Sequence, residues 1–180
     1  MEFFLYYNSQ ELGGDVQKEI MKNFQEMKNW IDYLKIDDKY SDDIKKKKCI
    51  LFIFLWMQYN EFYNIKYSTI KSDREKALKI AEDFEVQTIY EELKGVFLSK
   101  FKVLGESNVY IRESIYNYYL NREESFTDEN NSIAKFLEII YTIRGNFFHG
   151  NKPPMSENVD IIAWAYDCFF ELLHKSKIIY

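Results

Sequence analysis

The stretch TIRGNFFHGNK, residues 142–152, contains the side chains of this sequence best suited to acid–base and phosphate chemistry. Arg144 supplies a permanent planar cation whose N–H groups match phosphate oxygens. His149 has an ordinary pKa of about 6.5, so it can take up and release a proton near neutral pH. A base that activates a ribose 2′-hydroxyl and a cation that stabilises the charge on phosphorus's oxygens are the minimum for cleaving RNA without a metal. Asn146 lies between them and offers an amide that could orient either group.

The spacing of the pair restricts how it could act. Arg144 and His149 are five residues apart, and on a continuous helix their side chains would point about 140° apart. They can meet only if the helix ends between them or if a second subunit brings its own copy across. Gly150 favours a helix end, because glycine just past the last helical residue often takes the left-handed conformation. A structural role stays open, since both side chains would also complement a helix dipole.

The residues around the pair resemble the signature of the HEPN superfamily, the helical domains of prokaryotic toxins, phage-defence proteins and CRISPR-associated ribonucleases. That signature is often written I-R-N-N-x-F-H-G-x-K, and the matching residues here are Ile143, Arg144, Asn146, Phe148, His149, Gly150 and Lys152. The segment FLWMQYNEFYN is similar to an early HEPN helix, roughly W-x-x-F-N-x-x-Y, through Trp56, Tyr59, Asn60 and Tyr63. Gly145 departs from the usual polar residue, and Asn151 stands where one branch has a tyrosine that a nucleotidyltransferase modifies.

The resemblance implies a metal-independent endoribonuclease that acts as a toxin or antiviral-defence effector. Arg144, His149 and Asn146 would be catalytic, Lys152 and Asn60 would bind the RNA substrate, and the product would carry a 2′,3′-cyclic phosphate. No cofactor is expected. HEPN relatives place two motifs together across a two-fold axis, so a homodimer is implied, and an antitoxin or regulatory protein is a further candidate partner. The alternative is a non-catalytic HEPN module that binds a partner protein or a nucleotide. Asn60 could equally make an ordinary hydrogen bond between helices.

Composition narrows the function classes. The chain of 180 residues has a formal net charge of −5 and 18% aromatic residues, with only 6 Gly and 2 Pro. The acidic balance argues against a protein that coats nucleic acid, because such binding depends on neutralising phosphates. It leaves room for an enzyme that touches RNA through a local basic patch. The run Lys45 to Lys48 is the one such cluster, and a solvated helix start or loop explains it more simply.

The compartment is predicted from the cysteines and from the longest apolar run. Cys49 and Cys168 stand alone, which is typical of buried thiols in a reducing compartment. The start, MEFFLYYNSQELGG, lacks the features of a signal peptide. The apolar run from Cys49 to Met57 has nine residues, whereas a membrane span needs roughly 20. We therefore expect a cytoplasmic protein with no membrane partner, and no residue cluster has the spacing of a metal site.

The apolar spacing predicts an all-α fold, an up-down bundle of five to seven helices in a single domain over residues 1–180. Residues 1–40 would form a helical extension of unknown role, with a helix from Asp15 to about Leu34. Ser41 marks the next helix start, and CILFIFLWMQYNEFYNIKY reads as helix, although its first nine residues could be an interior strand. A further helix is expected from residue 73, after Ser72, continuing helically to Gly105, and others are expected over residues 108–124, 133–148 after Asn131 or Ser132, and about 159–177. Residues 121–131 would form a polar connection, and the KPP loop would join the last two helices as an antiparallel hairpin.

Overall fold

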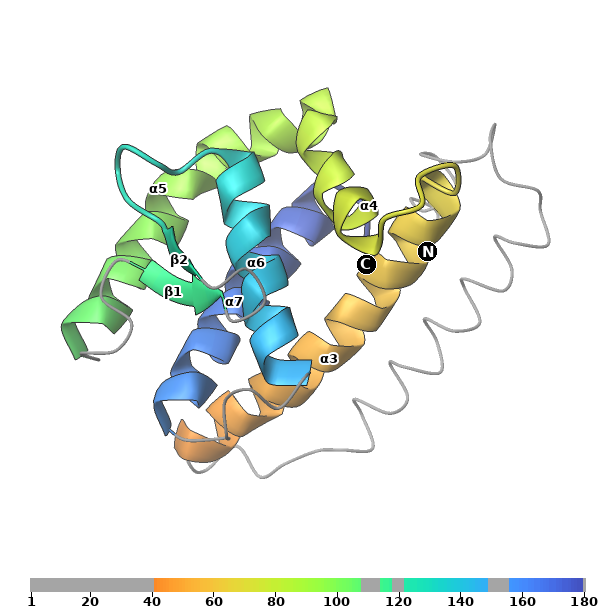
Figure 1. The fold of residues 1–180 in the computed structure, drawn as a ribbon. Coiled ribbons are helices and arrows are strands. Elements are labelled where there is room, and N and C mark those ends of the chain that lie inside the picture. Colours follow the sequence, from red (N-terminus) through yellow and green to blue (C-terminus); the bar gives the residue numbers. More distant parts are fainter. Residues whose placement is uncertain (1–40, 108–113, 118–121, 149–155, 180) are drawn as a thin grey trace.

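The computed structural model describes residues 41–107, 114–117, 122–148 and 156–179. Figure 1 shows an arrangement of helices with one small two-stranded sheet beside them, so the prediction of an all-α fold is confirmed. The predicted helix over residues 15–34 and the KPP loop lie outside the described residues. The elements are α3 (Ser41–Lys66), α4 (Asp73–Lys79), a 3-10 helix (Ile80–Glu82), α5 (Phe84–Ser107), β1 (Ser114–Asn117), β2 (Arg122–Ser125), α6 (Ile133–Phe148) and α7 (Ser156–Lys175).

Serine side chains cap two of the helices at the predicted places. Ser72 accepts a hydrogen bond from the Glu75 backbone N–H at 3.3 Å and so caps α4. Ser132, rather than Asn131, plays this role for α6, because its hydroxyl accepts from the Lys135 N–H at 3.3 Å. Such bonds satisfy backbone donors that have no partner within the first turn. The alternative of an interior strand within residues 49–57 is wrong, because α3 is helical throughout.

The expectation of continuous helix from residue 73 to residue 105 misses a break. The chain passes through the 3-10 helix, and α5 begins again after Asp83. Asp83 Oδ1 accepts from the N–H groups of Glu85 at 3.0 Å and Val86 at 3.4 Å. Its carboxylate therefore acts as a new N-terminal cap, and an aspartate at this place competes with continuation of the preceding helix.

The helix predicted over residues 108–124 is wrong where the structure describes that region, and the polar connection predicted from residue 121 begins only after Ser125. β1 and β2 pair as antiparallel strands, with Ser114 opposite Ser125 and Asn117 opposite Arg122. Ile115 and Tyr116 are residue types that favour strands, and the antiparallel ladder supplies partners for their backbone groups. α7 also differs, since it begins at Ser156 rather than near Val159 and ends at Lys175. Lys177 adopts a positive φ of 56°, which turns the chain out of the helix.

The core between the helices combines aliphatic side chains with many aromatic rings. α3 packs against α7 and α4, and α6 contacts α4, α5 and α7; Figure 1 shows α6 and α7 running in opposite directions. Phe136 of α6 stacks on Phe97 of α5 with ring centroids 5.2 Å apart. The buried polar ends of neighbouring rings are satisfied by backbone carbonyls, as when Trp164 Nε1 donates to Phe97 O at 3.2 Å and Tyr90 Oη donates to Asn131 O at 2.9 Å.

Two lysines of the run at residues 45–48 form ion pairs between helices. Lys45 Nζ lies 2.7 Å from Asp160 Oδ1, and Lys48 Nζ lies 2.6 Å from Asp167 Oδ2. Both acids belong to α7, so these contacts join the start of α3 to α7. The run therefore serves at least in part in helix packing.

Other sequence expectations can be compared with the described ranges. Cys49 and Cys168 are buried as predicted, and burial raises the pKa of the Cys49 thiol to about 11. Within these ranges no helix combines the length and the apolar character needed to cross a membrane.

The core predicts a large difference between two phenylalanines. Phe136 is 0% exposed, whereas Phe84 is 82% exposed at the start of α5. We expect Phe136→Ala to lower the free energy of unfolding by about 3–5 kcal/mol, while Phe84→Ala should change it by less than about 0.5 kcal/mol. Urea denaturation of both variants measures this. Equal losses would show that Phe136 does not occupy the core described here.

Candidate functional site

Arg144 lies near the C-terminal end of α6, against two aromatic rings. Its guanidinium carbon is 5.4 Å from the centroid of the Trp56 ring and 5.8 Å from that of Tyr141. The two rings meet edge to face with their centroids 5.7 Å apart. Tyr141 precedes Arg144 by three residues on α6, a spacing that places side chains on the same helix face. Both contacts are within the distance at which the ring quadrupole attracts a cation.

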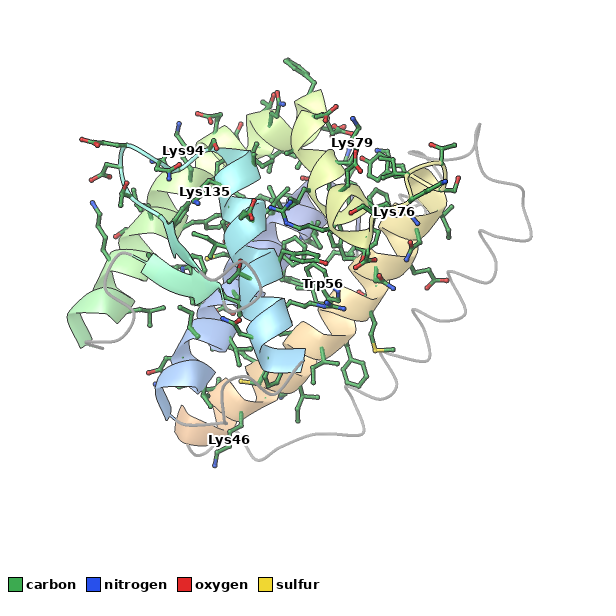
Figure 2. The ribbon with its side chains drawn as sticks, viewed as in Figure 1. Lys46, Trp56, Lys76, Lys79, Lys94 and Lys135 are labelled. Atoms are coloured by element: carbon green, nitrogen blue, oxygen red, sulfur yellow. The ribbon has the colours of Figure 1, made fainter. Side chains whose placement is uncertain are left out.

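Trp56 reaches this position from α3 and is buried, with 3% exposure. Figure 2 shows it on α3 between that helix and α6. Its ring also contacts Phe169 of α7, with centroids 6.0 Å apart. Among the described residues its indole N–H has no hydrogen-bond acceptor, so its observed contribution is the ring itself. Trp56 therefore forms a rigid aromatic surface that is shared by three helices.

A group of polar residues lies beside these rings. Asp73, in the first turn of α4, accepts a hydrogen bond from Tyr63 Oη at 2.9 Å through Oδ1 and one from Tyr141 Oη at 3.4 Å through Oδ2. The Tyr63 hydroxyl also lies within hydrogen-bond distance of Asn60 Oδ1. A hydroxyl has one proton, so Asp73 and Asn60 share this donor. We call Asn60, Tyr63, Asp73 and Tyr141 the Asp73 cluster.

The orientation of Asn60 is determined by a chain of donors. Lys76 Nζ of α4 can only donate, and it lies 2.8 Å from Asn64 Oδ1. Asn64 must therefore turn its Nδ2 the other way, and that nitrogen donates to Asn60 Oδ1 at 3.3 Å. Asn60 Oδ1 thus accepts from Asn64 on one side and faces the Tyr63 hydroxyl on the other. Figure 2 places Lys76 on α4 above this part of α3.

Burial and two opposite charges act on the tyrosines of the cluster. Burial raises the pKa of Tyr63, and the hydrogen bond and charge of Asp73 raise it further, while Arg144 lowers it. Burial also raises the pKa of Tyr141, again with Asp73 adding to the effect and Arg144 opposing it. Both hydroxyls therefore stay protonated at neutral pH and remain hydrogen-bond donors. Asp73 and Arg144 thus act on the pKa values of the same two phenols in opposite directions.

Two of the five site residues predicted from the sequence, Asn60 and Arg144, are linked through shared neighbours in the structure. Asn60 belongs to the Asp73 cluster, and Tyr141, a member of that cluster, contacts Arg144. Asn146 is also on α6 but is buried, with 8% exposure. It follows Arg144 by two residues, which turns it about 200° around the helix and away from the Arg144 face. His149 and Lys152 lie outside the described residues.

Asp73 and Tyr141 were not predicted as site residues. Tyr141 had a signal, since an aromatic residue three positions before Arg144 on a helix must lie near it. Asp73 had none, because it is 10 residues from Tyr63 and 68 from Tyr141, and an acid after the capping Ser72 already has an explanation as a helix start. Its neighbour Arg74 pairs with Glu138 of α6, which holds α4 against α6 next to the cluster.

Two further expectations concern Gly145 and metal ligands. A Cβ added at Gly145 would meet no atom within 4 Å, so a side chain at this position would meet no clash at its first carbon. Within the described part of the chain, no group of three or more His, Cys, Asp or Glu side chains is placed to hold a metal ion.

The raised pKa of Tyr63 predicts a pH-dependent stability. The unfolded chain releases the phenol proton near pH 10, while the folded chain keeps it to higher pH. Stability from this group is therefore fully present below pH 10 and is lost as pH rises, by up to about 1.4 kcal/mol per pH unit. In Tyr63→Phe the free energy of unfolding should fall less steeply between pH 10 and 11 than in the unmodified protein. Denaturant titrations across that range test this, and parallel slopes would contradict it.

Comparison of the chain with protein-family models, with curated proteins and with solved structures gives no match. The resemblance to HEPN domains therefore rests on the residues quoted above, of which Trp56, Asn60, Tyr63 and Arg144 lie together around the site. What the site can do follows from the chemistry of these side chains.

Proposed function

We propose that this protein is a metal-independent endoribonuclease of the HEPN type that acts as a toxin or antiviral-defence effector in the cytoplasm. The observation that carries the proposal is the seating of Arg144 over the rings of Trp56 and Tyr141. The N–H groups of a guanidinium lie in one plane, an arrangement that can bind two phosphate oxygens at once. An arginine supported in this way loses little conformational freedom when it binds a phosphate.

The proposed reaction is an internal transfer at phosphorus. His149 removes the proton from the ribose 2′-hydroxyl, and the 2′-oxygen attacks the adjacent phosphorus. The bond from phosphorus to the 5′-oxygen of the next nucleotide breaks, and that oxygen takes a proton from the acid form of a histidine. The products are a 2′,3′-cyclic phosphate and a 5′-hydroxyl. Arg144 stabilises the negative charge on the equatorial oxygens as it develops.

The remaining proposed roles differ in how directly they would touch RNA. Lys152 would bind phosphate, and Asn60 would contribute from the Asp73 cluster. Asn146 is buried on another side of α6, so its help would be to orient the end of the helix that leads to His149. A homodimer would bring two copies of the motif together and supply the second histidine, and an antitoxin or regulatory protein would restrain the activity.

A second candidate is a non-catalytic helical module that binds a partner protein or a nucleotide. The burial of Asn146 and the packing of Arg144 on the core residue Trp56 favour it, because both are also what a purely structural motif would show. The two candidates differ in what variants of Arg144 and His149 would change.

The proposed chemistry predicts cleavage that is independent of added metal. RNA incubated with the purified full-length protein should be cut equally well with and without EDTA, because the histidine supplies the base and the arginine supplies the cation. Analysis of the fragments should show 2′,3′-cyclic phosphate and 5′-hydroxyl ends. Cleavage that needs Mg²⁺ or Mn²⁺, or that leaves 5′-phosphate ends, would count against the mechanism.

Variants of the pair separate catalysis from structure. We expect Arg144→Lys to lose most of its activity, because lysine keeps the charge but lacks the planar fork, and His149→Ala to lose all detectable activity. Arg122→Lys is the matched control, since it makes the same exchange in β2, outside the motif. Thermal melts are recorded on the same samples.

The outcomes point in opposite directions for the two candidates. Loss of cleavage with an unchanged melting temperature supports the ribonuclease. Full cleavage in His149→Ala together with a melting temperature several degrees lower would favour the structural module.

A further inference from the structure

Asp73 connects three helices through its two carboxylate oxygens. It belongs to α4, while its hydrogen-bond donors Tyr63 and Tyr141 belong to α3 and α6. α4 is also held on both sides of this point, since Lys76 binds Asn64 of α3 and Arg74 pairs with Glu138 of α6. The carboxylate therefore occupies a position that both neighbouring helices define.

Each tyrosine bound by Asp73 either contacts Arg144 or packs on a ring that does. The Tyr141 ring itself lies under the guanidinium. The Tyr63 ring packs edge to face on Trp56, the other supporting ring, with centroids 6.4 Å apart. The Tyr141 hydroxyl therefore positions a ring that Arg144 contacts directly, and the Tyr63 hydroxyl positions a neighbour of the other ring.

The charge of Asp73 adds an electronic effect. A phenol that donates to a carboxylate has a more electron-rich ring than one that donates to a neutral group, because neighbouring hydrogen bonds and charges polarise one another. The attraction between a cation and an aromatic face grows with the negative potential of that face. We expect Asp73 to strengthen the contact between Tyr141 and Arg144 in this way, through the phenol rather than through a direct contact with the guanidinium.

We propose that Asp73 is a positioning residue for Arg144, which it holds in its phosphate-binding orientation through Tyr63 and Tyr141. Its kinetic consequence rests on the proposed ribonuclease function, whereas its structural consequence does not. Displacement of a catalytic group by about an ångström can cost up to about a hundredfold in rate, and the loss of one side of this bridge would permit such a movement.

The test uses Asp73→Asn in the full-length protein. The amide keeps the size of the side chain but loses the charge and has only one oxygen that can accept. It therefore cannot hold both hydroxyls through separate oxygens, and Tyr63 is left to donate to Asn60 Oδ1. Glu75→Gln is the matched control, because it removes an equal charge from the same first turn of α4, where Glu75 is exposed. Asp73→Glu retains both oxygens and the charge and serves as the rescue variant.

Two measurements are made on each variant. The first is kcat/KM for RNA cleavage, which should fall ten- to a hundredfold in Asp73→Asn, stay unchanged in Glu75→Gln and recover in part in Asp73→Glu. The second is the NMR signal of the Arg144 Nε–H group. The chain has four arginines, so Arg144→Lys assigns the signal directly. Ring currents of Trp56 and Tyr141 act on this group, and its chemical shift should move in Asp73→Asn but not in Glu75→Gln.

The two measurements distinguish the proposals from each other. If the Arg144 signal moves in Asp73→Asn while no variant and no unmodified protein cleaves RNA, the positioning role stands and the ribonuclease proposal fails. An Arg144 signal that does not move in Asp73→Asn overturns the positioning role whatever the activity. Unchanged kcat/KM in Asp73→Asn of an active ribonuclease overturns its kinetic consequence and leaves the ribonuclease proposal standing.

Discussion

The burial of the Trp56 ring between α3, α6 and α7 is the interaction on which the candidate site depends. This ring contacts Tyr141 of α6, Phe169 of α7 and the guanidinium of Arg144. Because protein interiors are close-packed, moving the ring would require all three helices to shift. The position of the cation is thereby coupled to the packing of the core, and the stability of the core carries over to the geometry of the site.

Three tyrosines connect this core to the polar side of the site, with their rings in the core and their hydroxyls at its edge. Tyr59, Tyr63 and Tyr141 all contact Trp56 through their rings, and each hydroxyl donates to an oxygen at the edge of the core. Tyr59 uses the Ala77 carbonyl at 2.6 Å, while Tyr63 and Tyr141 use Asp73. A phenylalanine could fill the same space but could not bind α4. The hydroxyls therefore explain how α4, a short helix of 7 residues, keeps a defined place beside Arg144.

The parts of this arrangement that sequence reasoning predicted are those governed by local chemistry. Ser72 and Ser132 each place a hydroxyl just before a run of helix-forming residues, which is a recognisable signal of a helix start. The motif around Arg144 is contiguous in the sequence, so it can be read without knowing the fold. The errors arose where two local preferences compete. Asp83 can either continue a helix or cap a new one, and Ile115 and Tyr116 become strand residues because a partner strand is available. Asp73 was not predicted as a site residue for a different reason. It is 68 residues from Tyr141 in the sequence, and only the fold brings the two side chains together.

The charges of the molecule limit the ways in which the proposed ribonuclease site would bind RNA. The chain is acidic overall, with a formal net charge of −5, and Lys45 and Lys48 of its tetralysine run form ion pairs with Asp160 and Asp167. Long-range attraction is therefore a poor source of affinity, because it requires many cations to replace counterions along the phosphate backbone. A site of this kind must rely on a few well-placed cations. Under that constraint the orientation of Arg144 matters more than the total positive charge, and the aromatic seat made by Trp56 and Tyr141 provides such an orientation.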